Sequence, residues 1–272
     1  NRHNEKDNLQ ETSEEWRLLE IFMAEFVGTA LLLFFGCMSS LVWSESAEIH
    51  PWAGSVVFAV TVTTIIQMIG HISAAHLNPA VTVCFYILGH ITALQALVYF
   101  VAEVLGSILG FGVLKFITPC DIYEMSMQYS GDKLCVTYPH ESVTDLQAFL
   151  AEFLATSLLV LVVCSVVDGR NKGDSSVPLK FGATILLLCI AEGPFTGASM
   201  NPSRSLSPVI WTGAWDKHWI YWIAPLAGGF FATIFYVKLF SEKITQKNII
   251  AWKKRAEDCH FQLNSCLGCQ VC

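Results

Sequence analysis

The tripeptide Asn-Pro-Ala at residues 78–80 recurs as Asn-Pro-Ser at residues 201–203, and each copy lies in the middle of an apolar stretch. Each copy also opens a hydrophobic segment that is too short to cross a bilayer, because a spanning helix needs about 20 apolar residues. Two such segments, one in each half of the chain, indicate a pore that is built by an internal repeat.

The sequence around the two motifs supports the duplication. Gly70 lies eight residues before Asn78, and Gly193 lies eight residues before Asn201. Further upstream, AEFVGTALLLFFGC at 24–37 matches AEFLATSLLVLVVC at 151–164 at half of its positions, with Glu, Thr and Cys in register. Chance similarity between apolar segments would supply the leucines but not these three residues, so we interpret the pattern as a true repeat.

The composition is that of a membrane protein. Of 272 residues, 53% are hydrophobic and 14% are charged, whereas about a quarter of the residues in soluble domains are charged. We therefore predict an all-α membrane protein with six transmembrane helices and two re-entrant half-helices in an inverted repeat. The predicted crossings are residues 18–43, 52–70, 94–117, 147–167, 177–192 with its flanks, and 219–240.

These crossings define the expected organisation of the chain. Residues 18–240 form the channel domain, with inverted repeats at 18–118 and 146–240, and residues 1–17 and 241–272 form tails. Lys and Arg accumulate in cytoplasmic loops, and with both termini in the cytoplasm only Lys115, Lys133 and Lys217 fall outside. The sequence therefore predicts a multi-pass protein of the cell membrane with both tails cytoplasmic. The net charge of −7 comes mainly from the N-terminal tail and exposed loops.

The ten cysteines differ by location. Those in apolar segments are expected to be small buried hydrophobes. Cys120 and Cys135 both fall in the predicted outer loop between the third and fourth crossings, where oxidation can occur. We predict a disulfide between them, and alkylation of both residues without reductant would contradict it. The cysteines expected to be buried are Cys37, Cys84, Cys164 and Cys189.

The C-terminal tail holds two weaker signals. Residues 259–272 (CHFQLNSCLGCQVC) contain several cysteines but no second Cys-x-x-Cys pair at zinc-finger separation, which favours reversible lipidation slightly over zinc binding. The stretch IIAWKKRA at 249–256 fits calmodulin or anionic lipid, although a short helix along the membrane surface is the ordinary interpretation. We expect no metal site, no cofactor and no nucleic acid partner.

The two motifs suggest a specific chemistry. Asn78 and Asn201 would each begin a half-helix, with proline at the first helical position, where its missing N–H has no cost. If both loops fold inward, two positive helix ends and two amides meet near the middle of the membrane. A water molecule there would accept from both amides, which interrupts a proton-conducting chain. A single Asn-Pro would only suggest a helix start, whereas two copies in a repeat favour a pore.

Four segments carry a resemblance to a known family: AEFVGT, GHISAAHLNPAVT, AEFLAT and FTGASMNPSRS. Over residues 18–240 the chain resembles the aquaporin, or major intrinsic protein, family. The resemblance implies a right-handed bundle of six helices with two re-entrant half-helices, assembled as a homotetramer with one pore in each protomer. The motif residues are then Asn78, Pro79, Ala80, Asn201, Pro202 and Ser203.

The resemblance also assigns roles to buried polar residues. Glu25 and Glu152 correspond to carboxylates that brace the backbone of the re-entrant loops, which explains ionisable groups at this depth. His76 resembles a position that packs around the first motif. Glu103 stands where the family commonly has Gln. Catalysis by His71 or His76 is disfavoured because no nucleophile or metal set accompanies them, so we do not expect an enzyme.

Four positions form the narrowest constriction in this family, and their spacing from the two motifs assigns them to Phe58, Cys189, Ala198 and Arg204. Water-selective members resemble one another in having His at the position of Cys189. Without that imidazole the opening is wider and less polar, while Arg204 still donates to oxygen atoms and disfavours cations. This combination predicts passage of small neutral solutes, namely glycerol, urea and water.

Other residues point the opposite way. Ser205 follows the motif arginine where glycerol facilitators resemble one another in having Asp, and Tyr221 and Trp222 look like the water-channel branch. A water-type scaffold without the filter histidine resembles the insect entomoglyceroporins, so we expect a passive channel for glycerol, urea and water that excludes protons and ions. The alternatives are a water-selective aquaporin, a junctional or adhesive protein with this fold, and a coupled transporter, for which no ion-coupling site is evident.

Overall fold

The computed structural model describes residues 2–44 and 51–240. The chain divides into two compact units, Asn1–Thr233 and Ile234–Cys272, and the contacts discussed below lie within the first. Of the second unit only residues 234–240 are described. The C-terminal stretches 249–256 and 259–272 therefore lie outside the described residues. The elements are α1 (Arg2–Met38), α2 (Pro51–Ser73), α3 (Pro79–Ile87), α4 (Ala93–Ile117), α5 (Cys120–Tyr129), α6 (Asp145–Val167), η1 (Gly169–Asn171), α7 (Val177–Thr196), α8 (Pro202–Thr212) and α9 (Ile220–Leu239).

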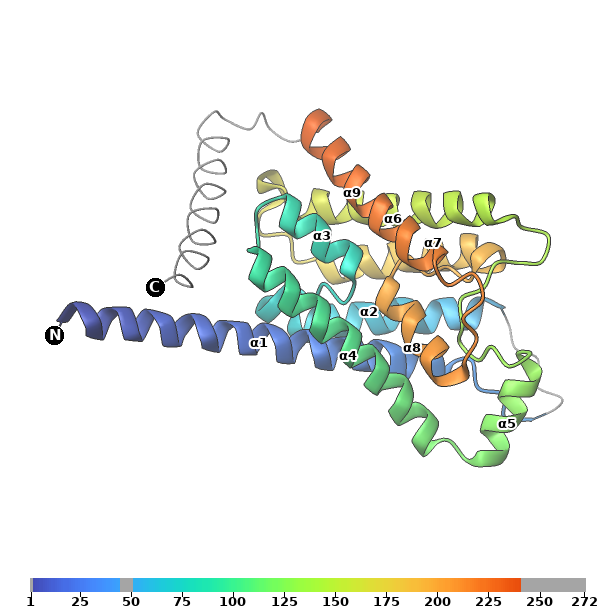
Figure 1. Cartoon of the computed structure of the whole chain (residues 1–272). Helices are drawn as coiled ribbons and strands as arrows, with labels where there is room; N and C mark the ends of the chain where they lie inside the picture. The colour runs from blue at the N-terminus through green and yellow to red at the C-terminus, as the bar shows by residue number, and fades with distance from the viewer. Residues whose placement is uncertain (1, 45–50, 241–272) are drawn as a thin grey trace, which may run out of the picture. The chain divides into compact units, whose positions relative to one another are not determined.

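Six of these helices are long and apolar enough to cross a membrane, namely α1, α2, α4, α6, α7 and α9. This confirms the predicted all-α architecture, in which α3 and α8 are the two short helices that follow the motifs (Figure 1). One predicted end was wrong: helix α1 begins at Arg2 and ends at Met38 rather than at residue 43. Helix α7 ends at Thr196, within the flanks of the predicted crossing, where Gly197 in a left-handed conformation ends it.

Local signals explain where α4 and α6 start. Thr92 and Thr144 each accept a hydrogen bond from the backbone N–H three residues later, and the glutamine at that position bonds back to the threonine N–H. These two capping boxes begin α4 and α6. Helix α5 was not predicted, because it is a short amphipathic helix in a loop that does not span the membrane.

The duplication is visible in how the helices pack. Gly106 of α4 lies so close to α1 that a methyl group in place of its hydrogen would lie 2.2 Å from the carbonyl oxygen of Phe26. In the second repeat the same substitution at Gly228 of α9 would bring the methyl group to 2.6 Å from the carbonyl oxygen of Phe153 in α6. Phe26 and Phe153 follow the repeated Ala-Glu pairs. Small residues thus permit equivalent close helix crossings in both halves.

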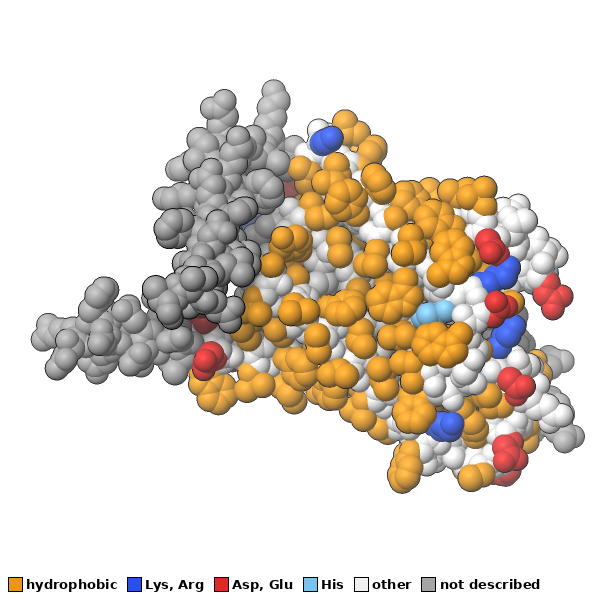
Figure 2. Space-filling model, viewed as in Figure 1, with side chains coloured by type: hydrophobic (Ala, Val, Ile, Leu, Met, Phe, Trp, Pro, Cys, Tyr) orange, Lys and Arg blue, Asp and Glu red, His pale blue; other side chains and the backbone are white. Residues whose placement is uncertain are grey.

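The outer surface of the helices is apolar. Figure 2 shows hydrophobic side chains over the middle of the visible face, with most of the visible acidic and basic side chains gathered at its right-hand end. Large exposed residues such as Leu97, Leu154 and Phe231 contribute to this surface. An apolar belt of this extent is what a lipid bilayer requires of the helices that it contacts.

Candidate functional site

Both motifs begin a short helix in the same way. The side chain of Asn78 accepts a hydrogen bond from Ala80 N at 2.9 Å and caps α3, with Pro79 at the first helical position. The side chain of Asn201 accepts from Ser203 N at 3.0 Å and from Arg204 N at 3.2 Å, and it caps α8. Each asparagine therefore uses its carbonyl oxygen to hold its own helix and keeps its amide N–H₂ group for other partners.

These amide groups join the two repeats. Asn78 Nδ2 donates to the carbonyl oxygen of Met200 at 2.8 Å, and Asn201 Nδ2 donates to the carbonyl oxygen of Leu77 at 2.7 Å. The exchange is reciprocal, so the N-terminal ends of α3 and α8 meet inside the molecule. Each amide nitrogen carries a second hydrogen that these contacts do not use.

The loop before Asn78 is held by a buried carboxylate. Glu25 of α1 is fully buried. Its Oε1 accepts from Ser73 Oγ at 2.5 Å and from His76 N at 2.9 Å, and its Oε2 accepts from Leu77 N at 2.7 Å. The loop needs these partners because it leaves helical geometry at membrane depth, where unpaired backbone groups are costly.

Glu152 of α6 makes the corresponding contacts in the second repeat. Its Oε1 accepts from Thr196 Oγ1 and from Ser199 N, and its Oε2 accepts from Met200 N, all at 2.8 Å. Both carboxylates thus have the contacts expected of bracing residues. Leu77 and Met200, whose carbonyl oxygens accept from the motif asparagines, also have matching left-handed backbone angles, with φ of 55° and 52°.

His76 packs beside the first motif. Its ring lies 4.0 Å from that of Tyr99 and 4.1 Å from that of Phe85, measured between centroids. Its Nδ1 is 2.9 Å from Thr82 Oγ1, and that hydroxyl donates to Glu103 Oε1 at 2.8 Å. Glu103 thus accepts at a position where an amide oxygen would serve equally well.

Two cavities share part of their lining. The first, the motif cavity, has a volume of about 430 Å³ and is lined by both motif asparagines and by His76. The second, the vestibule, has a volume of about 650 Å³ and is lined by residues that include Trp52 and His140. The lining residues that the two cavities share are Phe58, Cys189, Ala198 and Arg204.

These four residues come from three elements and one loop. Phe58 lies on α2, Cys189 on α7, Ala198 in the loop before α8, and Arg204 on the first turn of α8. The guanidinium carbon of Arg204 lies 4.8 Å from the centre of the Phe58 ring. Arg204 Nη1 donates to the carbonyl oxygen of Cys135 at 2.8 Å. The structure therefore brings together the four positions that were selected by counting from the motifs.

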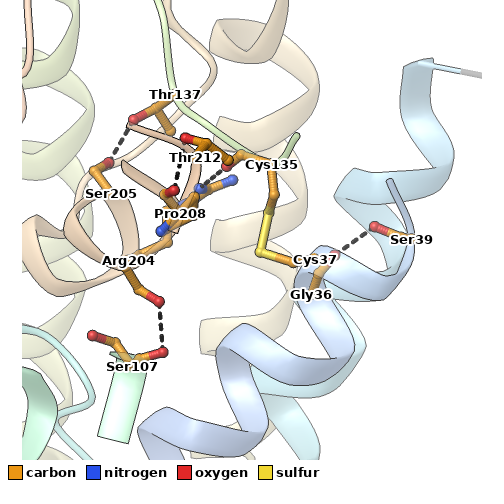
Figure 3. Close-up of a disulfide and its surroundings, with 11 residues drawn as sticks. Gly36, Cys37, Ser39, Ser107, Cys135, Thr137, Arg204, Ser205, Pro208 and Thr212 are labelled. Atoms are coloured by element: carbon orange, nitrogen blue, oxygen red, sulfur yellow. Dashed lines mark hydrogen bonds between the residues drawn. A yellow bond between two sulfur atoms is a disulfide. The ribbon is translucent and has the colours of Figure 1, made fainter. Parts of the chain in front are cut away.

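The disulfide differs from the expected one. Cys135 is bonded to Cys37, at the end of α1, and not to Cys120 (Figure 3). Cys120 is a free, exposed cysteine at the start of α5. Cys37 and Cys135 are both buried in the same apolar cluster, so the loop folds back toward α1 instead of pairing within itself. The prediction was wrong because Cys37 was assigned to the membrane interior.

Comparisons with known proteins agree with this geometry. A family model for the major intrinsic protein matches residues 12–236. The chain belongs to the major intrinsic protein family. Aquaporin-2 of Rattus norvegicus is 36% identical over 244 residues, which cover 88% of this chain and 86% of the relative. Nodulin-26 of Glycine max is 36% identical over 211 residues, covering 77% and 74%.

A solved structure extends the family comparison. The X-ray structure of the aquaglyceroporin from Plasmodium falciparum superimposes with a TM-score of 0.72 at 26% sequence identity, covering 82% of this chain and 96% of that chain. Family membership and six apolar helices make this protein a multi-pass membrane channel for water and small solutes.

Sequence reasoning missed several contacts that support this part of the channel. Tyr99 and Tyr221 donate to the carbonyl oxygens of Ser73 and Thr196, at 2.5 and 2.7 Å, at equivalent points of the two repeats. The spacing of these pairs along the chain is nearly equal, and this signal could have revealed them. The carbonyl oxygen of Cys135 had no comparable signal, because a backbone acceptor leaves no trace in residue type.

Proposed function

We propose that this channel conducts glycerol, urea and water and excludes ions and protons. The observation that supports the proposal is the set of four residues at the junction of the two cavities. Arg204 supplies the charge and the hydrogen-bond donors there, while Phe58, Cys189 and Ala198 are apolar or weakly polar. A small polyol can therefore donate and accept on one side and slide its carbon skeleton along the other.

Cys189 is the residue on which the choice of solute depends. An imidazole at this position would fill part of the opening and add a polar group, which favours water alone. A thiol leaves the opening wider. The Plasmodium falciparum structure is described as an aquaglyceroporin, and its likeness to this chain supports the same solute class without deciding it.

Exclusion of protons follows from the paired amides. Asn78 and Asn201 both line the motif cavity, and each has one N–H that is not used in the bond between the repeats. A water molecule between them accepts twice, which turns both of its own hydrogens away and interrupts proton transfer. The positive ends of α3 and α8 repel cations at the same point.

The test is stopped-flow light scattering on vesicles that contain the purified channel. Cys189→His is expected to abolish glycerol and urea permeability and to leave water permeability largely intact. Cys189→Ser is the matched control, because it removes the thiol with little change in width, and its glycerol permeability should equal that of the parent. Glycerol flux that survives in Cys189→His would contradict the assignment, and a parent channel that passes only water would support the water-selective alternative.

The assembly and orientation are parts of the same proposal. The family resemblance supports a homotetramer with one pore in each protomer, both termini in the cytoplasm, and membership of the insect subgroup. Cross-linking in the membrane tests the first. Protease access to the tails in sealed vesicles of known sidedness tests the location of the termini, and cleavage from the extracellular side would contradict the proposed orientation.

A further inference from the structure

The loop between α5 and α6 holds the Arg204 side chain through a contact that involves neither Asn-Pro motif. In Figure 3 the disulfide links Cys37, at the end of α1, to Cys135, and the carbonyl oxygen of Cys135 points to Arg204. Arg204 Nη1 donates to that oxygen at 2.8 Å. This is the hydrogen bond that the guanidinium donates to the described part of the chain. The position of the cation in the opening therefore depends on where this one carbonyl group lies.

We propose that the Cys37–Cys135 disulfide is a positioning element for solute selection. It fixes the backbone at Cys135, so that the carbonyl oxygen holds the guanidinium against the wall of the opening. The inference rests on the proposed function, because it assumes that the junction lined by Arg204 selects the solute.

The backbone at Cys135 needs such a constraint. Its φ of 60° lies in the left-handed region, which residues with a side chain rarely adopt. A residue in this conformation is kept there by its surroundings, and the direction of its carbonyl group changes if the backbone relaxes. A covalent bond from its side chain to the end of α1 restricts this relaxation more firmly than packing alone.

The same loop is attached to the second repeat on its other side. Thr137 Oγ1 lies 2.6 Å from Ser205 Oγ, which lies 2.5 Å from Ser199 Oγ. A methyl group on Gly197 would lie 3.0 Å from the Cα atom of Thr137, so the two loops are in close contact. Thr137 therefore joins the loop to the re-entrant segment before α8, and the disulfide joins it to the first repeat.

The residue next to Cys37 supports a second wall of the opening. A methyl group on Gly36 would lie 2.4 Å from the Phe58 ring, so this ring packs directly against α1. The Phe58 ring in turn lies 4.8 Å from the guanidinium carbon of Arg204. The last turn of α1 thus determines the separation of Phe58 and Arg204, through packing on one side and through the disulfide on the other.

Loss of the disulfide is expected to narrow the opening for the larger solute. When the carbonyl oxygen of Cys135 is no longer held, the guanidinium is free to leave the wall and enter the opening, where it interacts with water. Glycerol needs the full width and water does not. Glycerol permeability should therefore fall more than water permeability.

The experiment compares the parent channel with the double variant Cys37→Ser/Cys135→Ser in vesicles of equal protein content. We expect the ratio of glycerol to water permeability to fall by at least about twofold, because losing a hydrogen bond to a charged group shifts a two-state equilibrium by about tenfold. Cys120→Ser is the matched control, since Cys120 is free and lies in the same connection between crossings, and its ratio should equal that of the parent.

A purely structural disulfide would behave differently. Its removal would lower the melting temperature of the channel and the number of active channels. The ratio of glycerol to water permeability would not change. A ratio that equals or exceeds that of the parent overturns the inference. If the double variant does not fold, the ratio is measured on parent channel that is reduced with dithiothreitol after folding, with the freed thiols verified by peptide mass spectrometry. Cys189→His, measured in parallel, shows separately whether the junction selects the solute at all.

Discussion

Replacing Glu152 by alanine is expected to destabilise the channel through two backbone groups rather than through a lost ion pair. The carboxylate is fully buried and accepts from Thr196 Oγ1, Ser199 N and Met200 N. Glu152→Ala leaves both backbone N–H groups without their acceptor. Each unpaired buried group costs about 1–3 kcal/mol. Ser199 and Met200 line the motif cavity, so water can replace part of the loss, and we expect a total of about 2–4 kcal/mol.

The repeat makes this prediction sharper. Glu25 accepts from Ser73 Oγ, His76 N and Leu77 N in the same arrangement, so Glu25→Ala should cost the same within about 1 kcal/mol. Glu152→Gln should cost about half as much, because the amide keeps one acceptor oxygen and presents a donor to the other N–H.

Equilibrium unfolding in mixed detergent micelles, followed by tryptophan fluorescence, measures these free energies. Glu141→Ala is the control, because Glu141 is an exposed carboxylate in the loop before α6. Vesicle assays should show lower water permeability for Glu152→Ala, since the loop that carries Asn201 loses its anchor. A cost below about 0.5 kcal/mol for Glu152→Ala, the range of ordinary surface substitutions, would refute the view that the carboxylate holds this loop.

Two further predictions concern other parts of the fold. Gly106→Ala should lower the free energy of unfolding by about 1–3 kcal/mol in the same micelle assay, because the added methyl group meets the backbone of Phe26. Gly70→Ala is the control and should be near neutral, since its methyl group meets only a side-chain atom at 3.4 Å. Equal effects of the two substitutions would contradict the close crossing of α1 and α4. Burial lowers the pKa of His218, so the stability that the neutral ring contributes is complete above the unfolded pKa of about 6.5 and is lost as pH falls through the lowered folded value. Melting curves between pH 7 and 4.5 should show less acid destabilisation for His218→Gln than for the parent, and parallel curves would count against this assignment.

Much of the site was predictable because its signals repeat at fixed spacing. Asn78 and Asn201 located the two short helices, and counting from them selected Phe58, Cys189 and Arg204, which the structure places at one junction between two cavities. The spacings themselves came from the family resemblance, and they apply here because regular helices and short loops connect these residues to the motifs.

The partner of Cys135 was not predictable by the same reasoning. The two bonded cysteines are separated by 98 positions, and nothing local in either segment indicates which of ten cysteines will meet. The backbone of Cys135, with its positive φ, turns toward α1 because of packing between distant elements. Sequence patterns report helix periodicity and spacing well, and they report the direction of a single loop carbonyl hardly at all.

The two repeats have the same residue types at the positions that hold the backbone and different residue types at the positions where the solute is proposed to be selected. Twelve residues before Asn78 and three after it lie Ile66 and Val81, the counterparts of Cys189 and Arg204. Both line the motif cavity, and neither carries a charge or a donor, so the first repeat offers a solute an apolar wall. A second arginine there would place another desolvated cation in one narrow path, and an unpaired buried charge is costly. The duplicated asparagines and carboxylates therefore hold the scaffold, and under the proposed function divergence at these few positions selects the solute.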